Sequence, residues 1–123
     1  MHLIIFVHSM NKSEFIFLFF IMLAYSLLWW LLAPYLGYLL DSDGVAYLTI
    51  ARRVADGDFQ KSINGLWSPL NSWVLAPFIK MGFNAWEVAK VFNFFVGLCL
   101  IVLVNKLNQL FIEDGRMRKW MLL

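Results

Sequence analysis

The fold of this chain is decided by an uncharged apolar stretch, FIFLFFIMLAYSLLWWLLAPYLGYLL, which occupies residues 15–40. A helix needs about 20 apolar residues to cross the hydrocarbon core of a bilayer. A cleaved secretory signal has a shorter apolar region that ends in small residues, whereas this stretch carries Trp29, Trp30 and Pro34 in its outer part. We therefore predict a retained membrane helix over residues 14–40, with a kink at Pro34.

The composition of the whole chain agrees with a membrane protein. Hydrophobic residues make up 62% of the 123 residues and charged residues 15%, whereas soluble domains are about 45–50% apolar and about 25% charged. A single small domain cannot bury so much apolar surface, so we expect lipid to cover the surplus. The net charge of +2 and the scattered basic residues exclude a nucleic-acid partner. The one cysteine, Cys99, excludes an internal disulfide.

A second membrane helix is predicted over residues 85–111. Asn84 and Glu87 have the spacing of a capping box at its start, and Gly115 lies just past its end. Polar or small residues then recur at helical spacing, and we call them the polar stripe: Glu87, Lys90, Asn93 and Gly97. The polar stripe is expected either to face other protein or to lie at the level of the lipid headgroups, and the sequence leaves both open.

The distribution of Lys and Arg predicts that both chain ends lie on the cytoplasmic side. The terminal regions hold five basic residues, Lys12, Lys106, Arg116, Arg118 and Lys119, against four in the intervening loop, Arg52, Arg53, Lys61 and Lys80. Residues 1–13 and 112–123 are then cytoplasmic segments, and residues 41–84 form an outer loop, periplasmic or extracellular.

The outer loop is expected to contain two helices that lie along the membrane surface. Residues 45–55 have the pattern of an amphipathic helix, which Gly57 is placed to end. Its polar face consists of Thr49, Arg52, Arg53 and Asp56.

A second loop helix is predicted over residues 69–81, with Ser68 as its N-cap, Pro69 at its first position and a kink at Pro77. The predicted fold is thus an all-α membrane protein: two transmembrane helices joined by an outer loop with two interfacial amphipathic helices.

Two carboxylates follow the first membrane helix directly, in the sequence Asp41-Ser42-Asp43-Gly44. Asp43 is placed to N-cap the helix expected from Val45, because an acidic residue is stabilised at a helix N-terminus. A carboxylate in this position can also act as a general base on a substrate hydroxyl or amine. The residues alone leave both roles open, and capping does not exclude catalysis.

The stretch DSDGVAYLTIARRV, residues 41–54, resembles the first outer loop of GT-C superfamily glycosyltransferases. These polytopic enzymes use polyprenyl-phosphate-linked sugars, and they include protein O-mannosyltransferases and the aminoarabinose transferases of lipid A. Members show an acidic pair or D-x-D after the first membrane helix, then a Tyr, an Ile-Ala-Arg-like helix, a Gly and a Pro-Leu-rich helix. The resemblance spans residues 14–107, and its matching residues are Asp43, Tyr47, Ile50-Ala51-Arg52, Gly57, Trp67-Ser68-Pro69-Leu70 and Leu75-Ala76-Pro77-Phe78.

The resemblance implies an enzyme in which Asp43 is the catalytic base and Asp41 supports it. Many members have a second acid directly after the first, where this chain has Gly44, so Asp41 and Asp43 form a D-x-D pair. If the enzyme uses a divalent cation, Mg or Mn, these two carboxylates are the expected ligands. The candidate substrate-binding residues are Tyr47, Arg52, Arg53 and Lys61. The three basic residues either steer anionic lipid heads or form a solvated helix face, and the sequence leaves both open.

GT-C enzymes have many more crossings than two, and the last residues of this chain read as the start of a third apolar segment. The resemblance therefore implies the N-terminal fragment of a larger hexosyltransferase-type enzyme of the bacterial inner (plasma) membrane, inactive alone. Its partners are then membrane lipid, the polyprenyl-phosphate-linked sugar and the remaining helices of the parent enzyme. Two other functions remain open: a small non-enzymatic two-helix membrane protein that docks onto a larger complex, and a transporter fragment with Asp41 and Asp43 at a pore mouth.

Overall fold

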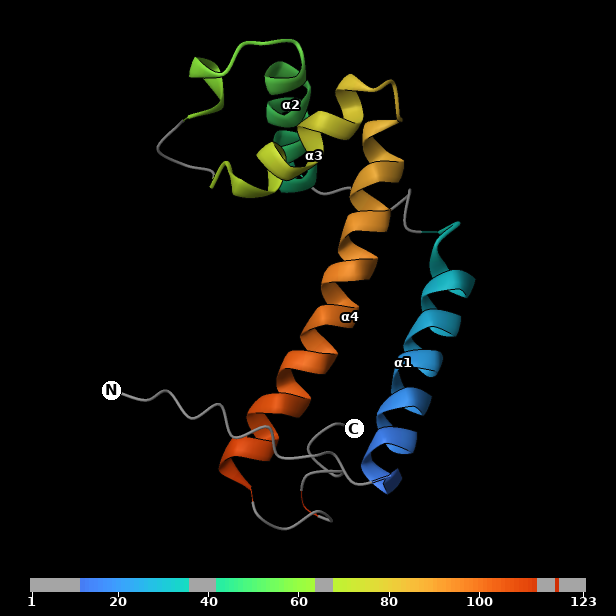
Figure 1. The fold of residues 1–123 in the computed structure, drawn as a ribbon. Coiled ribbons are helices and arrows are strands. Elements are labelled where there is room, and N and C mark those ends of the chain that lie inside the picture. Colours follow the sequence, from blue (N-terminus) through green and yellow to red (C-terminus); the bar gives the residue numbers. More distant parts are fainter. Residues whose placement is uncertain (1–11, 36–41, 64–67, 113–116, 118–123) are drawn as a thin grey trace, which may run out of the picture. The chain divides into compact units, whose positions relative to one another are not determined.

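The computed structural model describes residues 12–35, 42–63, 68–112 and 117, and the regular structure in these residues is all helical. The helices in chain order are α1 (Lys12–Leu32), α2 (Ser42–Ala55), the short 3₁₀ helix η2 (Gln60–Ser62), α3 (Leu70–Lys80) and α4 (Ala85–Phe111) (Figure 1). The expected all-α class is confirmed for this part of the chain. The chain divides into two compact units, Met1–Leu28 with Val96–Leu123, and Trp29–Phe95.

By length and composition, α1 and α4 are able to cross a membrane. At about 1.5 Å per residue, the 21 residues of α1 extend about 31 Å and the 27 residues of α4 about 40 Å. A bilayer core is about 30 Å thick. The large apolar side chains of α1 are mostly exposed, among them Phe15, Phe19, Phe20 and Trp30.

The end of α1 differs from the expectation. The helix stops at Leu32, short of the expected residue 40, and Pro34 lies beyond its end, so the predicted kink at Pro34 is wrong. A proline ring clashes with the carbonyl four residues earlier and disfavours helical geometry in the residue before it, which accounts for the stop. The amide of Tyr35 donates to the carbonyl of Leu32 at 2.9 Å and closes a turn there. Residues 36–41 lie outside the described residues.

In the unit Met1–Leu28 with Val96–Leu123, α1 meets α4 at Gly97. The hydroxyl and ring of Tyr25 occupy the position that a β-carbon of residue 97 would take. Glycine permits this contact because it has no side chain, and small residues likewise permit close helix crossings in membrane proteins. Gly97 of the polar stripe therefore packs against another helix of the same chain.

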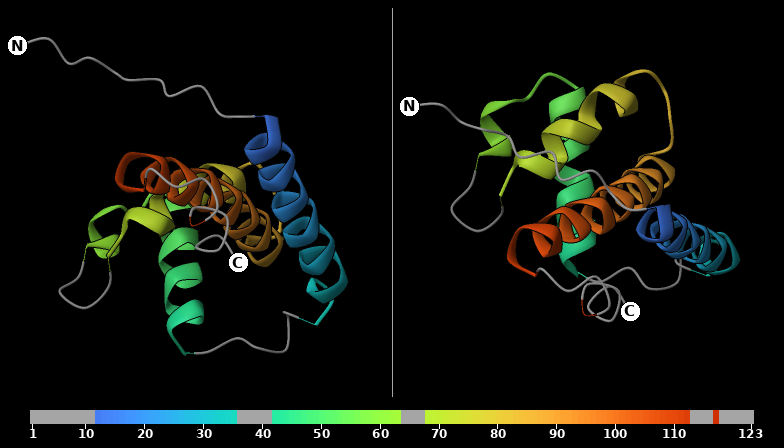
Figure 2. Two further views of the ribbon diagram at one scale, coloured as in Figure 1. Left: turned by 90° about the horizontal axis from the view of Figure 1, so that it is seen from below. Right: turned by 60° about the horizontal axis from the view of Figure 1, so that its bottom comes forward.

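In the unit Trp29–Phe95, α2 and α3 cross and pack against each other (Figures 1 and 2). Their shared core also takes in the first residue of α4, and it consists of Leu48, Ala51, Leu75 and Ala85. Ser72 of α3 is fully buried, and its Oγ donates a hydrogen bond to the carbonyl of Tyr47 in α2 at 2.9 Å. A serine is small enough to let the two helices cross closely while it satisfies a buried carbonyl.

The short helix η2 is tied to α3 through Trp73. The indole Nε1 of Trp73 donates to Ser62 Oγ at 3.1 Å, and this hydroxyl donates to the carbonyl of Phe59 at 2.6 Å. The rings of Phe59 and Trp73 stack with their centroids 5.2 Å apart. The described part of the loop between α1 and α4 is therefore folded and packed, and it contains α2 and α3 where two helices were expected.

Two glycines end the loop helices. Gly57 and Gly82 have φ values of 93° and 94°, which residues with a β-carbon rarely adopt. After α2, the amide of Gly57 donates to Val54 at 3.0 Å and that of Asp58 to Arg53 at 2.9 Å, the paired bonds of a Schellman motif. The prediction that Gly57 ends this helix is confirmed.

The loop helices begin at other residues than expected. Because α2 starts at Ser42, Asp43 lies inside its first turn and is not the N-cap of a helix that starts at Val45. The α3 helix starts at Leu70 after Pro69, which makes no side-chain cap, so Ser68 is not its N-cap. Proline's preset φ already suits the helix entrance, and the first bond runs from Trp73 to the Pro69 carbonyl at 2.9 Å. Pro77 lies inside α3, and its kink stays a prediction.

Asn84 caps α4 as the sequence predicted. Its Oδ1 accepts hydrogen bonds from the amides of Trp86 at 2.9 Å and Glu87 at 3.4 Å. The Glu87 carboxylate lies 2.7 Å from the ammonium of Lys90 one turn along. Gly115, expected to end this helix, lies outside the described residues.

Candidate functional site

The candidate site is built on the first turn of α2. Asp43 is exposed there, and the hydroxyl of Ser42 donates a 3.3 Å hydrogen bond to its Oδ1. A carboxylate in a first turn is stabilised by the unpaired amides and the dipole of the helix. Tyr47 follows four residues later, which places it on the same face of α2. Asp41 lies outside the described residues.

A cavity of about 130 Å³ opens beside this turn, among α2, α3 and the first turns of α4. We call it the amide cavity, because two asparagine side chains stand among aromatic and aliphatic ones. Its lining residues are Gly44, Tyr47, Leu48, Asn71, Leu75, Trp86, Ala89, Phe92 and Asn93. Asp43 is not itself a lining residue, but it directly precedes Gly44 and lies one turn before Tyr47, which both line the cavity.

The two amides come from different helices, Asn71 from α3 and Asn93 from α4. Both residues are exposed, and neither side chain has a hydrogen bond to another described residue. Each amide offers two donor hydrogens and an acceptor oxygen to whatever occupies the cavity. The buried hydrogen bond from Ser72 to the Tyr47 carbonyl holds the two walls from α2 and α3 together.

The basic candidates lie elsewhere. Arg52 and Arg53 are exposed near the other end of α2, about 13 Å beyond Asp43 at 1.5 Å per residue. Lys61 lies in η2, where its Nζ is 2.6 Å from Asp58 Oδ2. The hydrogen bond from Lys61 lowers the pKa of the Asp58 carboxyl. The structure thus brings Tyr47 toward Asp43 but does not bring Arg52, Arg53 or Lys61 to the same place.

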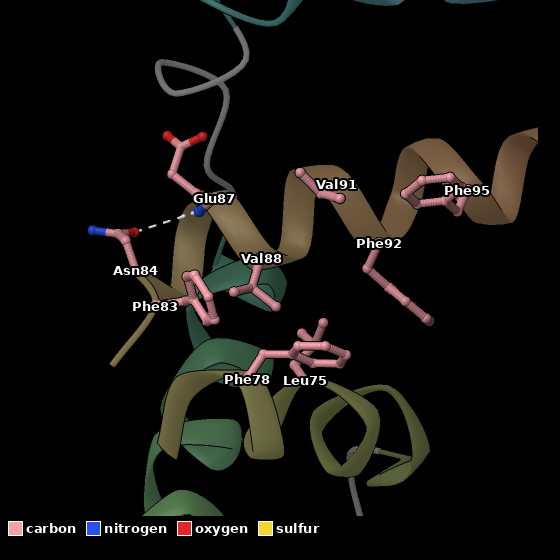
Figure 3. A pocket seen from close by; sticks show the side chains of 9 residues that line it. All are labelled: Leu75, Phe78, Phe83, Asn84, Glu87, Val88, Val91, Phe92 and Phe95. Atoms are coloured by element: carbon pink, nitrogen blue, oxygen red, sulfur yellow. Dashed lines mark hydrogen bonds between the residues drawn. The ribbon is translucent and has the colours of Figure 1, made fainter. Parts of the chain in front are cut away.

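A second hollow, an apolar groove of about 560 Å³, lies on another face of the first turns of α4 (Figure 3). Its lining residues are Leu75, Phe78, Phe83, Asn84, Glu87, Val88, Val91, Phe92 and Phe95. Figure 3 shows the carboxylate of Glu87 pointing away from Leu75 and Phe78. The groove therefore presents hydrocarbon surface, with its few polar groups at one end.

Sequence reasoning did not identify three of the residues that line the amide cavity. It placed Asn93 in the polar stripe without assigning it a ligand, and it did not single out Asn71 or Trp86 as site residues. The available signal was Asn93 itself, because an amide on a helix that is long and apolar enough to cross a membrane indicates a cavity or a partner. Asn71, the second amide of the cavity, can be identified as a partner of Asn93 only once α3 is packed against α2.

A divalent cation needs several oxygen ligands in one place. Within the part of the chain that the structure describes, no group of three His, Cys, Asp or Glu residues is arranged to hold a metal ion. Asp41 is not in that part, so the cation role of Asp41 and Asp43 stays a prediction.

Comparison with known proteins finds no matching protein-family model, no matching curated protein and no matching solved structure. The resemblance of residues 41–54 to GT-C enzymes accordingly stays an expectation, and the functional argument depends on the geometry of the site.

Proposed function

We propose that this chain is the acceptor-activating part of a membrane glycosyltransferase, which moves a sugar from a polyprenyl-phosphate donor to an acceptor on the outer face of the membrane. The observation that carries the proposal is the position of Asp43. Asp43 is exposed in the first turn of α2, one residue before Gly44 and one turn before Tyr47, and these two residues line a cavity together with two amides. A general base needs this combination of access and adjacent room for the group that it deprotonates. The resemblance of residues 41–54 to GT-C first outer loops supports the same assignment.

Insertion of α1 and α4 into a membrane is part of the proposal. It is supported by the length of both helices and by the exposure of their large apolar side chains. Trp30 of α1 is 70% exposed and Leu103 of α4 is 56% exposed. Soluble monomers rarely leave continuous apolar surfaces of this kind in water, whereas lipid covers them favourably.

In the proposed reaction, the acceptor hydroxyl attacks the anomeric carbon of the donor while Asp43 takes its proton. The bond from the anomeric carbon to the phosphate oxygen breaks, and polyprenyl phosphate leaves with the bonding electrons. One base opposite the leaving group is sufficient for such an inverting displacement. The hydroxyl of Ser42 donates a hydrogen bond to Oδ1 of Asp43. The donor phosphate is bound by other parts of the enzyme, because Arg52 and Arg53 lie too far along α2.

The substitution Asp43→Asn, made in the chromosomal gene, tests whether Asp43 is the catalytic base. The amide keeps the size of the side chain but cannot take a proton, so we expect turnover to fall by a factor of about 10² to 10⁴. The assay follows radiolabelled mannose or aminoarabinose from its undecaprenyl-phosphate carrier into product, in membranes from the substituted strain and from a deletion strain. Asp56→Asn is the matched control, because it removes an exposed carboxylate just past the other end of α2. Wild-type transfer in the Asp43→Asn membranes would assign Asp43 to helix stabilisation alone.

A second candidate function is a non-enzymatic membrane protein that docks onto a larger complex. The observation that favours it is the apolar groove at the start of α4 (Figure 3). Under this alternative, Asp43→Asn has no effect, whereas Val91→Glu in the groove removes the chain from its complex on native gels.

A further inference from the structure

We infer that the amide cavity is a binding site for one neutral sugar ring, which makes the acceptor of the proposed enzyme a glycan or glycolipid and not a protein side chain. The role of the bound sugar as the acceptor rests on the proposed function, whereas its binding is inferred from the cavity itself. Four properties of the described lining support the inference: its volume, its mixture of surfaces, its lack of charge and the position of Asn93 on α4.

The volume suits a single six-membered ring. The cavity measures about 130 Å³, and an engineered protein cavity of about 150 Å³ is known to hold one benzene molecule. A ring of this size fills the cavity, with its outward substituents in the open mouth. A serine or threonine side chain is much smaller and leaves most of the space empty.

The mixture of surfaces suits a polyol ring. A sugar ring has apolar C–H faces and hydroxyl groups around its edge. The aromatic side chains of Tyr47, Trp86 and Phe92 offer surfaces for the faces, and the amides of Asn71 and Asn93 offer partners for the edge. A hydroxyl both donates and accepts hydrogen bonds, and an asparagine amide complements both roles.

The described lining residues include no Asp, Glu, Lys or Arg. A charged ligand group, such as a phosphate or an ammonium, would lose its hydration in the cavity without gaining an opposite charge. The lining therefore favours a neutral ring over the phosphate of the donor.

Asn93 adds an argument from the membrane helix that carries it. An amide on a helix able to span a membrane is costly unless it meets a polar partner or a water-filled cavity. Asn93 borders the amide cavity and has no side-chain hydrogen bond to another described residue. A hydroxylated ligand supplies the partner that the described protein does not.

The test measures binding of methyl α-glucoside and methyl α-mannoside to the purified chain in lipid nanodiscs, by saturation-transfer NMR. We expect saturable binding of at least one glycoside, weakened about threefold to tenfold by Asn71→Ala or Asn93→Ala, the loss that one hydrogen bond accounts for. Gln60→Ala is the matched control, because it removes an exposed amide in η2 that does not line the cavity. Alanine is the best helix former, so the variants keep their helices, which circular dichroism verifies.

Two results would overturn the inference. One is the absence of saturable binding for both glycosides, or binding that Asn71→Ala and Asn93→Ala leave unchanged. The other is tighter binding of N-acetylthreonine methylamide with the same dependence on both asparagines, which would assign the cavity to a protein acceptor.

The same measurement separates this inference from the proposed function. Both glycoside binding and sugar transfer are measured in Asp43→Asn, because Asp43 is the proposed base but is not a lining residue of the cavity. Glycoside binding together with full transferase activity in Asp43→Asn would refute the base and leave the sugar site standing. Loss of transfer in Asp43→Asn without any glycoside binding would refute the sugar site alone.

Discussion

Lys61 donates a 2.6 Å hydrogen bond to Asp58, and this bond is the largest cause of the lowered pKa of the Asp58 carboxyl. Smaller contributions in the same direction come from the charges of Lys61 and Arg53. Both side chains of the pair are exposed enough for solvent to screen the interaction. Lys61 is therefore engaged with its neighbour, and a role in steering anionic lipid heads requires that it leave Asp58.

The substitution Lys61→Met should raise the pKa of Asp58 toward its ordinary value of 3.8. Because the folded pKa lies below the unfolded one, the pair stabilises the fold above the unfolded value and loses this effect as pH falls through the folded value. An NMR titration of the Asp58 carboxyl carbon measures the shift directly. Lys80→Met is the control and should leave the titration unchanged. An Asp58 pKa equal in Lys61→Met and wild type would mean that the pair does not persist in solution.

At the scale of helices, the contact between α1 and α4 depends on a residue without a side chain. The Tyr25 hydroxyl and ring occupy the space where a larger residue 97 would place its β-carbon. The tyrosine ring can swing away only by disturbing its own neighbours, since it already has an interaction within the chain. A side chain at position 97 therefore either displaces Tyr25 or separates the two helices at this point.

We expect Gly97→Ala to destabilise the protein by about 1–3 kcal/mol, the usual cost of adding atoms to a filled contact. Thermal unfolding in nanodiscs, followed by circular dichroism, measures the loss. The double variant Gly97→Ala with Tyr25→Ala should recover part of the lost stability, because the clashing ring is absent. The double-mutant cycle then shows a favourable coupling between the two substitutions. Equal costs of Gly97→Ala with and without the tyrosine would show that the helices do not meet at this position.

At the scale of the whole molecule, we propose that the loop with α2, η2 and α3 lies on the outer face of the membrane that α1 and α4 span. The exposed Gln60 of η2 gives a reporter position in this loop, and Ser13 gives one at the start of α1. Cys99 is exposed, so it must be replaced by serine to make a background for labelling.

In intact cells, a cysteine in place of Gln60 should react with a membrane-impermeant maleimide, because the loop faces outward. A cysteine in place of Ser13 should react only after permeabilisation, because the basic flanks keep the chain ends inside. The reverse pattern would refute the orientation, and labelling of both positions in intact cells would refute insertion of α1 across the membrane.

Some helix boundaries were readable from local sequence because their causes are local. The capping amide of Asn84 and the positive φ of Gly57 each act within a few residues of their own helix. The starts of α2 and α3 were expected at Val45 and Pro69 and lie at Ser42 and Leu70. A polar residue or a proline near a helix start does not by itself fix the first residue of the helix. The end of α1 was missed because the apolar run continues past Pro34, and the proline was expected to kink the helix and not to end it.

The sequence by itself determined an all-helical chain, with two helices able to cross a membrane, and it marked Asp43 as a candidate base, because charge, apolar run length and turn residues act locally. Only the tertiary structure decided that Asn71, Trp86 and Asn93 line one cavity with Tyr47. Residues on three helices become neighbours through the crossing of α2 and α3, which depends on buried contacts such as that of Ser72 with Tyr47. Such contacts join positions far apart in the chain, and no local pattern records them.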